Sequence, residues 1–134
     1  MASVSVGDSA TRTQLITDEM VRTFAELTGD TNPVHLDEEF AATTRFGRRI
    51  AHGMIAAGLI SATLANDLPG PGTVYLGQDL KFRGPVFLDD TVTVTVEVVS
   101  VREDKPIVTL STVCTNQNDD VVLEGEAVVM VPKE

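Results

Sequence analysis

Two residues that could act as an acid–base pair lie five positions apart near the start of the sequence. Asp30 and His35 flank a segment that contains Asn32 and Pro33. Pro33 has a fixed φ angle and pushes Asn32 toward extended geometry, so the segment is a stiff turn. A carboxylate and an imidazole held close together can take a proton from water and return one to a substrate. The alternative is an ordinary turn in which Asp30 caps backbone amides, and the residue pattern leaves both interpretations open.

A second candidate feature is the pair His52-Gly53, which opens a segment rich in small residues. An amide N–H at a helix N-terminus attracts negative charge, so the Gly53 amide could stabilise a developing oxyanion. The alternative is that Gly53 only permits close packing and that His52 is a partner in a turn. Ser61 lies two turns further along, where a buried serine usually bonds back to the preceding turn.

The elements that must position these residues begin with three predicted helices. Thr17 is a plausible N-cap for a first helix, which carries an apolar stripe as far as Leu27 and ends at Gly29. A short helix is expected from near Asp37 to about Thr43. A third helix is expected from Ile50 to about Asp67. Because that segment has no charge before Asp67, we expect it to be buried on most sides.

The remainder of the sequence predicts strands. Between positions 91 and 98, valines alternate with Thr and Glu, which is the period of a strand with one buried face. The segments Ile107–Thr115 and Val121–Val131 are also rich in β-branched residues, with a turn at Asn116–Asp120. A further strand, kinked near Gly84-Pro85, is expected within Thr73–Phe87. Long antiparallel strands and one buried helix indicate an α+β fold, in which a curved sheet wraps around a central helix. We expect residues 1–134 to form one domain.

Composition limits the classes of function. Twenty acidic and ten basic residues give a formal net charge of -10, which argues against a nucleic-acid partner. The single cysteine, Cys114, allows no intramolecular disulfide, so we expect a cytoplasmic protein. We expect Cys114 itself to be a core residue. The N-terminus does not resemble a signal peptide, and the segment 50–65 falls short of the ~20 apolar residues of a membrane span. Two histidines and one cysteine are too few for a recognisable metal site, so none is expected.

Several segments together resemble one known family. These are Leu27-Thr28-Gly29-Asp30-Thr31-Asn32-Pro33-Val34-His35-Leu36-Asp37, Phe40-Ala41-Ala42, Ala51-His52-Gly53-Met54, Tyr75-Leu76-Gly77-Gln78, Leu80-Lys81-Phe82 and Pro85-Val86-Phe87. The first resembles the hydratase 2 motif of MaoC-like, (R)-specific enoyl-CoA hydratases, and the likeness covers nearly the whole chain. One departure is Glu38, where many members carry proline. The resemblance implies a hot-dog fold.

The resemblance also implies a reaction and a set of site residues. Asp30 and His35 would activate a water that adds at C3 of a trans-2-enoyl-CoA, with a proton delivered to C2 on the same face. The Gly53 amide would bind the thioester oxygen, and Ser61, Asn32 and His52 would lie near the substrate. The product would be an (R)-3-hydroxyacyl-CoA, which could supply polyhydroxyalkanoate synthesis. Coenzyme A is part of the acyl-CoA substrate, and no separate cofactor is implied.

Three other functions remain open. A related hydroxyacyl-thioester dehydratase subunit would run the same chemistry in reverse. An acyl-CoA thioesterase is disfavoured, because such enzymes usually place a carboxylate on the central helix and the segment 50–65 has no Asp or Glu. A non-catalytic acyl-binding module could dispense with the Asp30–His35 pair, yet both residues are present.

Two expectations concern partners. The basic residues near the motifs could line the coenzyme A phosphates, or they could be ordinary surface residues: Arg45, Arg48, Arg49, Lys81 and Arg83. A single unit of this fold leaves sheet edges open, so we expect a homodimer that pairs them.

Overall fold

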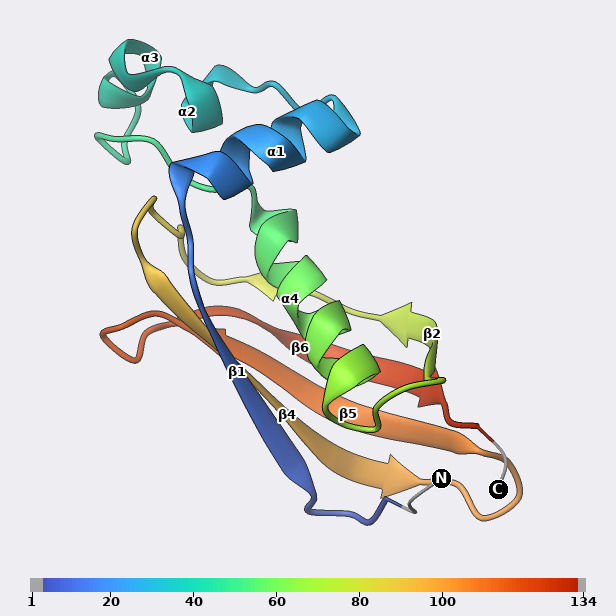
Figure 1. Cartoon of the computed structure of the whole chain (residues 1–134). Helices are drawn as coiled ribbons and strands as arrows, with labels where there is room; N and C mark the ends of the chain where they lie inside the picture. The colour runs from blue at the N-terminus through green and yellow to red at the C-terminus, as the bar shows by residue number, and fades with distance from the viewer. Residues whose placement is uncertain (1–3, 133–134) are drawn as a thin grey trace.

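The computed structural model, which describes residues 4–132, packs one long helix across a six-stranded sheet (Figure 1). In chain order the elements are β1 (Ser9–Leu15), α1 (Asp18–Thr28), α2 (Pro33–Leu36), α3 (Glu38–Ala42), α4 (Gly53–Asn66), β2 (Val74–Gln78), β3 (Lys81–Phe82), β4 (Thr91–Val101), β5 (Ile107–Thr115) and β6 (Val121–Met130). The smaller helices α1–α3 lie beyond one end of the sheet, next to the start of α4. This confirms the predicted α+β hot-dog architecture of a sheet around a central helix.

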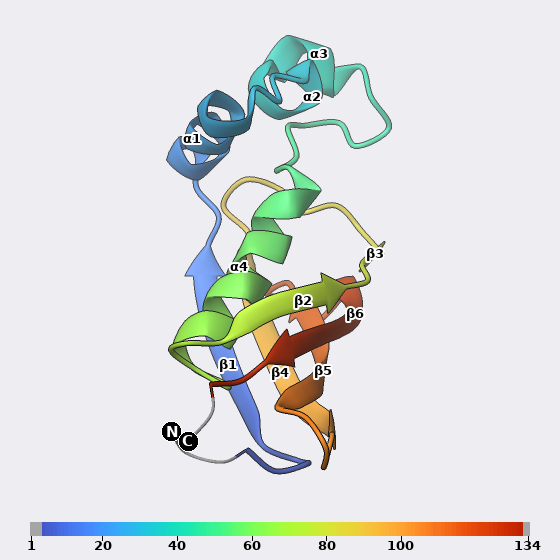
Figure 2. The same ribbon diagram turned by 90° about the vertical axis from the view of Figure 1, so that its right-hand side faces the viewer.

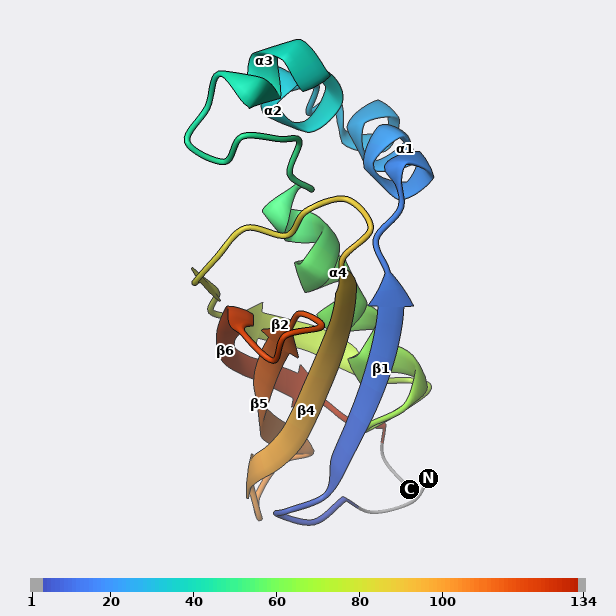
Figure 3. The ribbon, with the colours of Figure 1, turned by 90° about the vertical axis from the view of Figure 1, so that its left-hand side faces the viewer.

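The sheet is antiparallel and follows the order β1-β4-β5-β6-β2, with β3 also paired to β6. Figure 2 shows β2 beside β6 at one edge, with α4 crossing the sheet. Figure 3 shows β1 beside β4 at the other edge. The predicted β4, β5 and β6 are confirmed, as is the turn at Asn116–Asp120, where Asp119 N–H donates to the Asn116 carbonyl.

The core lies between α4 and the sheet. The alternation in β4 marks a strand with one buried face, as predicted. The buried residues are Val92, Val94, Val96 and Val98. Ile60 and Leu64 of α4 are buried against them. Cys114 is also buried, as expected, and burial raises the pKa of its thiol to about 12. This packing fixes the position of α4 and therefore of the residues at its N-terminus.

Helix α1 has the predicted ends. The Thr17 hydroxyl accepts a hydrogen bond from Met20 N–H at 3.1 Å, and Gly29 ends the helix with a φ of 78°. A positive φ costs glycine little, so the chain can turn there directly toward Asp30. Helix α3 also occurs where it was predicted, with Asp37 as its N-cap and Thr43 as its C-cap.

The structure corrects the predicted start of the long helix. Ile50, Ala51 and His52 are not helical, and α4 begins at Gly53. Ile50 forms a β-bridge with Phe87, and Ala51 N–H donates to the Val86 carbonyl at 2.7 Å. These bonds hold the three residues in extended geometry, which a pattern of apolar residues cannot reveal.

The single strand predicted within Thr73–Phe87 is also wrong. The segment forms β2 and β3, which are separated because Asp79 bonds to Glu126 through both its backbone N–H and its side chain. β3 ends at Phe82, although the N–H groups of Arg83 and Gly84 still donate to the Val122 carbonyl of β6 at 2.9 and 3.4 Å.

One face of α4 departs from the prediction of a helix buried on most sides. Met54 and Gly58 are exposed, and Ala57 and Ser61 are only half-buried. This uncharged face opens beside β2 and α1. Among the described residues, no helix is both long and apolar enough to cross a membrane.

Candidate active site

The turn after α1 is built by its own side chains. Asp30 Oδ1 accepts a hydrogen bond from Asn32 N–H at 3.3 Å. Asn32 Oδ1 in turn accepts one from Val34 N–H at 3.1 Å and caps α2, which begins at Pro33. The Asp30 side chain therefore has one oxygen engaged in the turn, and its second oxygen has no hydrogen-bond partner within residues 4–132. Asp30 is exposed, whereas His35 at the other end of the turn is buried.

The orientation of His35 is fixed by the segment that precedes α4. Its Nδ1 lies 2.8 Å from the Ile50 carbonyl oxygen. A carbonyl can only accept, so Nδ1 carries the hydrogen and the neutral ring keeps its lone pair on Nε2. The corrected extended geometry of Ile50 is thus what provides this carbonyl. The result is an imidazole whose Nε2 is available as a base.

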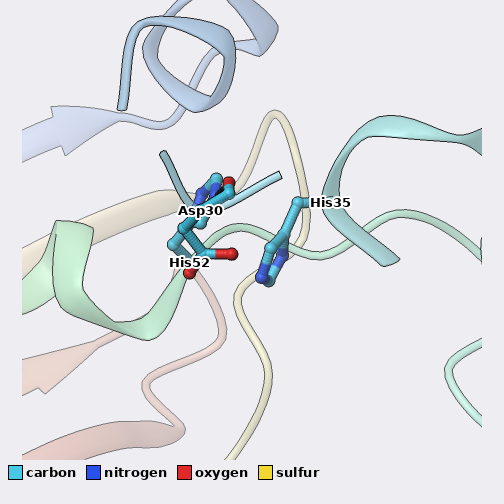
Figure 4. A group of neighbouring side chains, drawn as sticks. All are labelled: Asp30, His35 and His52. Carbon is cyan, nitrogen blue, oxygen red and sulfur yellow. Dashed lines mark hydrogen bonds between the residues drawn. The ribbon is translucent and has the colours of Figure 1, made fainter. Parts of the chain in front are cut away.

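His52 completes a cluster of three side chains (Figure 4). Ligand-type atoms of Asp30, His35 and His52 all lie within 4.8 Å of one another. The three side chains come from the loop after α1, from α2 and from the N-cap of α4. One water that accepts or donates two hydrogen bonds of about 2.8 Å can bridge atoms that are ~4.5 Å apart. The cluster therefore has the dimensions of a site for one water.

His52 itself is buried between two rings. Its Nε2 donates to the Asp30 backbone carbonyl at 3.0 Å, and its ring lies 3.9 Å from that of His35 and 4.7 Å from that of Phe24. Its other nitrogen, Nδ1, is buried and has no hydrogen-bond partner among the described residues. His52 thus holds the main chain of Asp30 and the plane of His35, and it presents little surface to a ligand.

The surroundings of His35 favour its neutral form. Burial lowers the pKa of His35 below its ordinary value of 6.5, and the neighbouring His52 and Arg49 side chains act in the same direction. The Ile50 carbonyl and the Asp30 carboxylate raise the pKa and offset part of the shift. A base must be unprotonated to act, so the net shift keeps His35 ready at neutral pH.

A cavity of about 500 Å³ opens beside His35, and Asp30 is not among the residues that line it. His35 lines it from one side and Gly53, the first residue of α4, from another. The first N–H groups of a helix have no partner within the helix, so the Gly53 amide is free to bind an oxyanion in this cavity. Ala56, Phe82 and Val86 supply apolar lining, and Arg45 lies at the same cavity.

Two of the predicted substrate-binding residues do not line this cavity. Ser61 lines a different cavity, between the open face of α4 and β2, and is not brought to Asp30 and His35. Asn32 caps α2, which gives its side chain a structural task in the turn.

The five basic residues also have different surroundings. Arg49 is buried, so among the five it is poorly placed to meet a coenzyme A phosphate. Arg83 pairs with Glu124 at 2.7 Å, and the Arg48 guanidinium stacks 3.9 Å above the Phe87 ring. The role of Ile50 and the proximity of Phe82 to Gly53 were missed by the sequence analysis, and no residue pattern signals either of them.

The same three side chains invite comparison with a metal site. His35 Nδ1 and His52 Nε2 are each committed to a backbone carbonyl. The two ring centroids lie 3.9 Å apart with the planes tilted by 31°, so the rings contact each other face to face, whereas ligands of one ion point at a common centre. The arrangement fits acid–base chemistry on a water better than metal binding.

A sheet around one helix, with an acid–base pair outside that helix, defines a hot-dog protein suited to adding or removing water. Comparison with known proteins agrees with this class. The family model described as "MaoC like domain" matches residues 5–118. This chain therefore belongs to the MaoC-like domain family.

Similar proteins are known in several bacteria. The chain is 49% identical over 130 residues to an (R)-specific enoyl-CoA hydratase of Aeromonas caviae, covering 97% of each protein. It is 55% identical over 111 residues to a 3-hydroxybutyryl-CoA dehydratase of Methylorubrum extorquens, covering 83% of this chain and 70% of the relative. The solved structure of the A. caviae (R)-hydratase involved in PHA biosynthesis superposes with a TM-score of 0.95 at 48% identity, and covers 98% of this chain and 100% of that one.

Proposed function

We propose that this protein is an (R)-specific enoyl-CoA hydratase, which adds water to a trans-2-enoyl-CoA to give an (R)-3-hydroxyacyl-CoA. The observation that carries the proposal is that the Asp30 carboxylate lies close to the imidazole of His35, which lines a cavity that Gly53 also lines. The similarity to the A. caviae hydratase over the full chain supports it.

The reaction requires two kinds of help, and the site can supply both. Water must lose a proton as it attacks C3, and the thioester oxygen must carry negative charge as the enolate forms. In the proposed mechanism, Asp30 and His35 hold the water, and His35 Nε2 accepts its proton. The proton returned to C2 comes from the same pair, so water and proton add on one face. The Gly53 amide binds the thioester oxygen, and one such donor is commonly worth about 3–4 kcal/mol.

The substrate's two ends fit different parts of the cavity. The apolar lining from Ala56, Phe82 and Val86 suits the acyl chain. Arg45 and Arg83 are both exposed and both line this cavity. Because Arg83 is paired with Glu124, Arg45 is the better placed of the two to meet a coenzyme A phosphate. Such a local positive charge would offset the repulsion expected from the formal net charge of -10.

The direct test follows loss of the conjugated enoyl-thioester absorbance with crotonyl-CoA as substrate. The product is then identified with dehydrogenases specific for the (R)- or (S)-3-hydroxyacyl thioester. Hydration to the (R)-product supports the proposal. Release of the free coenzyme A thiol without loss of the double bond would instead indicate a thioesterase.

The reverse reaction is the second candidate, because the M. extorquens relative is named as a dehydratase. Both directions share one transition state, and the site residues do not distinguish them. Initial rates with crotonyl-CoA and with (R)-3-hydroxybutyryl-CoA, and with the same acyl groups on acyl carrier protein, would separate a hydratase from a carrier-protein dehydratase.

We further propose that residues 1–134 act as one domain and pair as a homodimer. Support for the pairing comes from β2, an edge strand whose Val74, Tyr75 and Leu76 are exposed. The uncharged face of α4 lies next to this edge, and the two share a cavity. A second copy would cover both surfaces. A cytoplasmic location is proposed from the lone buried Cys114 and from the thioester substrate, and cell fractionation would test it.

A further inference from the structure

Arg49 is a buried cation whose guanidinium reaches the catalytic turn. Only 6% of the residue is exposed. Its Nε donates to the backbone carbonyl of His35 at 2.6 Å. It contacts the main chain that carries the imidazole, and it does not line the cavity of about 500 Å³. Arg49 therefore acts on His35 without being placed to touch a substrate in that cavity.

Two carboxylates from neighbouring helices balance the buried charge. Arg49 Nη2 donates to Asp18 Oδ1 of α1 at 2.6 Å, and Nη1 lies 3.7 Å from Glu38 Oε1 of α3. The hydrogen bond from Arg49 to Asp18 is the main cause of the lowered pKa of Asp18. A planar guanidinium can donate in several fixed directions at once, so one side chain ties α1, α2 and α3 together.

The residue next to Arg49 holds His35 from a second direction. The Ile50 carbonyl accepts the hydrogen of His35 Nδ1, and Ile50 N–H donates to the Val34 carbonyl at 3.2 Å. Arg49 thus binds the main chain of His35, and Ile50 binds its ring. Loss of the guanidinium bond would free the His35 carbonyl, while the ring would keep its hydrogen bond to the Ile50 carbonyl and its contact with the His52 ring.

We propose that Arg49 is a positioning residue, which fixes His35 so that Nδ1 stays on the Ile50 carbonyl and Nε2 faces the water site. This inference rests on the proposed function, because it assigns Arg49 to the geometry of the proposed base. A shift of about 1 Å in a catalytic group can cost ~100-fold in rate, so small movements of this turn matter. Substrate binding should depend much less on Arg49, which lies outside the cavity.

The test compares Arg49→Met and Arg49→Lys with Arg22→Met as the matched control. Arg22 donates to the same Asp18 carboxylate but is exposed and is not bonded to His35. Steady-state kinetics with crotonyl-CoA would be measured together with thermal melting and ¹⁵N NMR of the imidazole nitrogens. We expect kcat to fall roughly tenfold or more in Arg49→Met, with KM within about twofold of wild type. Lysine keeps the charge but cannot donate in several fixed directions at once. The kcat of Arg49→Lys should therefore lie between those of Arg49→Met and wild type.

The NMR signal separates positioning from general stability. Wild type and Arg22→Met should show the Nδ1-protonated tautomer of His35, whereas Arg49→Met should show a mixture of tautomers. A folded Arg49→Met with wild-type kcat and an unchanged tautomer would overturn the proposal. If Arg49→Met does not fold, Arg49→Lys decides, since wild-type kcat there would overturn it equally. An inactive wild-type protein would refute the proposed hydratase function instead, and the tautomer comparison would still test the role of Arg49.

Discussion

At the scale of single residues, the site depends on which nitrogen of His35 carries its hydrogen. The hydrogen is on Nδ1 because the Ile50 carbonyl accepts it, and the neighbouring His52 ring restrains the imidazole plane. Asp30 is held in turn by two hydrogen bonds, since its Oδ1 accepts from Asn32 N–H and its backbone carbonyl accepts from His52 Nε2. Neither Asp30 nor His35 is thus free to swing away from the other. This restraint costs nothing during the reaction, since folding has already imposed it.

The lowered pKa of His35 predicts the pH dependence of the reaction. Only the neutral ring can accept a proton, and burial shifts its protonation to a pH below the ordinary 6.5. We therefore expect kcat/KM to be flat near neutral pH and to fall as the pH drops through a midpoint below 6.5. A pH–rate profile with crotonyl-CoA measures this, with residual activity of His35→Gln as the reference. A midpoint above 6.5 would show that the charged form of His35 is the favoured one in the folded protein.

At the scale of elements, the N-terminus of α4 brings a donor to the cavity. Gly53 is the first helical residue, so its N–H is not used by the helix. A Cβ at this position would lie 2.6 Å from Phe82 Cε1, which means that any larger residue must displace the exposed Phe82 ring. Glycine at this position therefore allows the close approach of Phe82 to the start of α4.

A pair of substitutions can separate the loss of the Gly53 amide donor from the displacement of Phe82. Proline fits the first helical position, and the preceding His52, with a φ of -60° and a ψ of 133°, already has the extended geometry that proline demands. Gly53→Pro removes the N–H, whereas Gly53→Ala keeps it, and both displace Phe82. We expect kcat of Gly53→Pro to lie roughly 100-fold or more below that of Gly53→Ala. Equal kcat values in the two folded variants would assign the oxyanion donor to another group.

The elements also show how far the sequence was informative. The caps of α1 and the alternation in β4 are local patterns, and both were predicted. Strand β1 was not predicted, because its side chains are mostly exposed and carry no alternation of buried residues. The four-residue helix α2 was hidden because it begins at Pro33, inside a segment with turn composition.

The site residues also divide into those that the local sequence predicts and those that only the fold brings together. Asp30 and His35 are joined by one stiff turn, so their proximity could be anticipated from neighbouring residues. The Ile50 carbonyl and Arg49 join them through the return of a distant segment, which only the fold determines. The start of α4 was misplaced for the same reason, since the bonds that keep Ile50 and Ala51 extended come from His35 and Val86.

At the scale of the whole molecule, the open face of α4 and the β2 edge predict the homodimer. Gly58 lies on this face and lines the cavities on both sides of it. A Cβ there would meet nothing within 4 Å, so Gly58→Glu is accommodated by the isolated chain and is favourable for the helix itself. We expect wild type and the control Gly58→Ala to sediment as dimers at micromolar concentration, and Gly58→Glu as a folded monomer. A stable monomer for wild type, or an intact dimer for Gly58→Glu, would locate the interface elsewhere or remove it.

The most direct test of the whole account is a double-mutant cycle on Asp30 and His35. If the two side chains act as a unit on one water, their effects cannot add. Crotonyl-CoA hydration would be measured for wild type, Asp30→Asn, His35→Gln and the double variant, with folding checked by thermal melting. Each single variant should lose activity on the order of 100-fold or more, and the double variant should be scarcely worse than either. Near wild-type hydration by both folded single variants would contradict the account, and would leave the pair as no more than a turn.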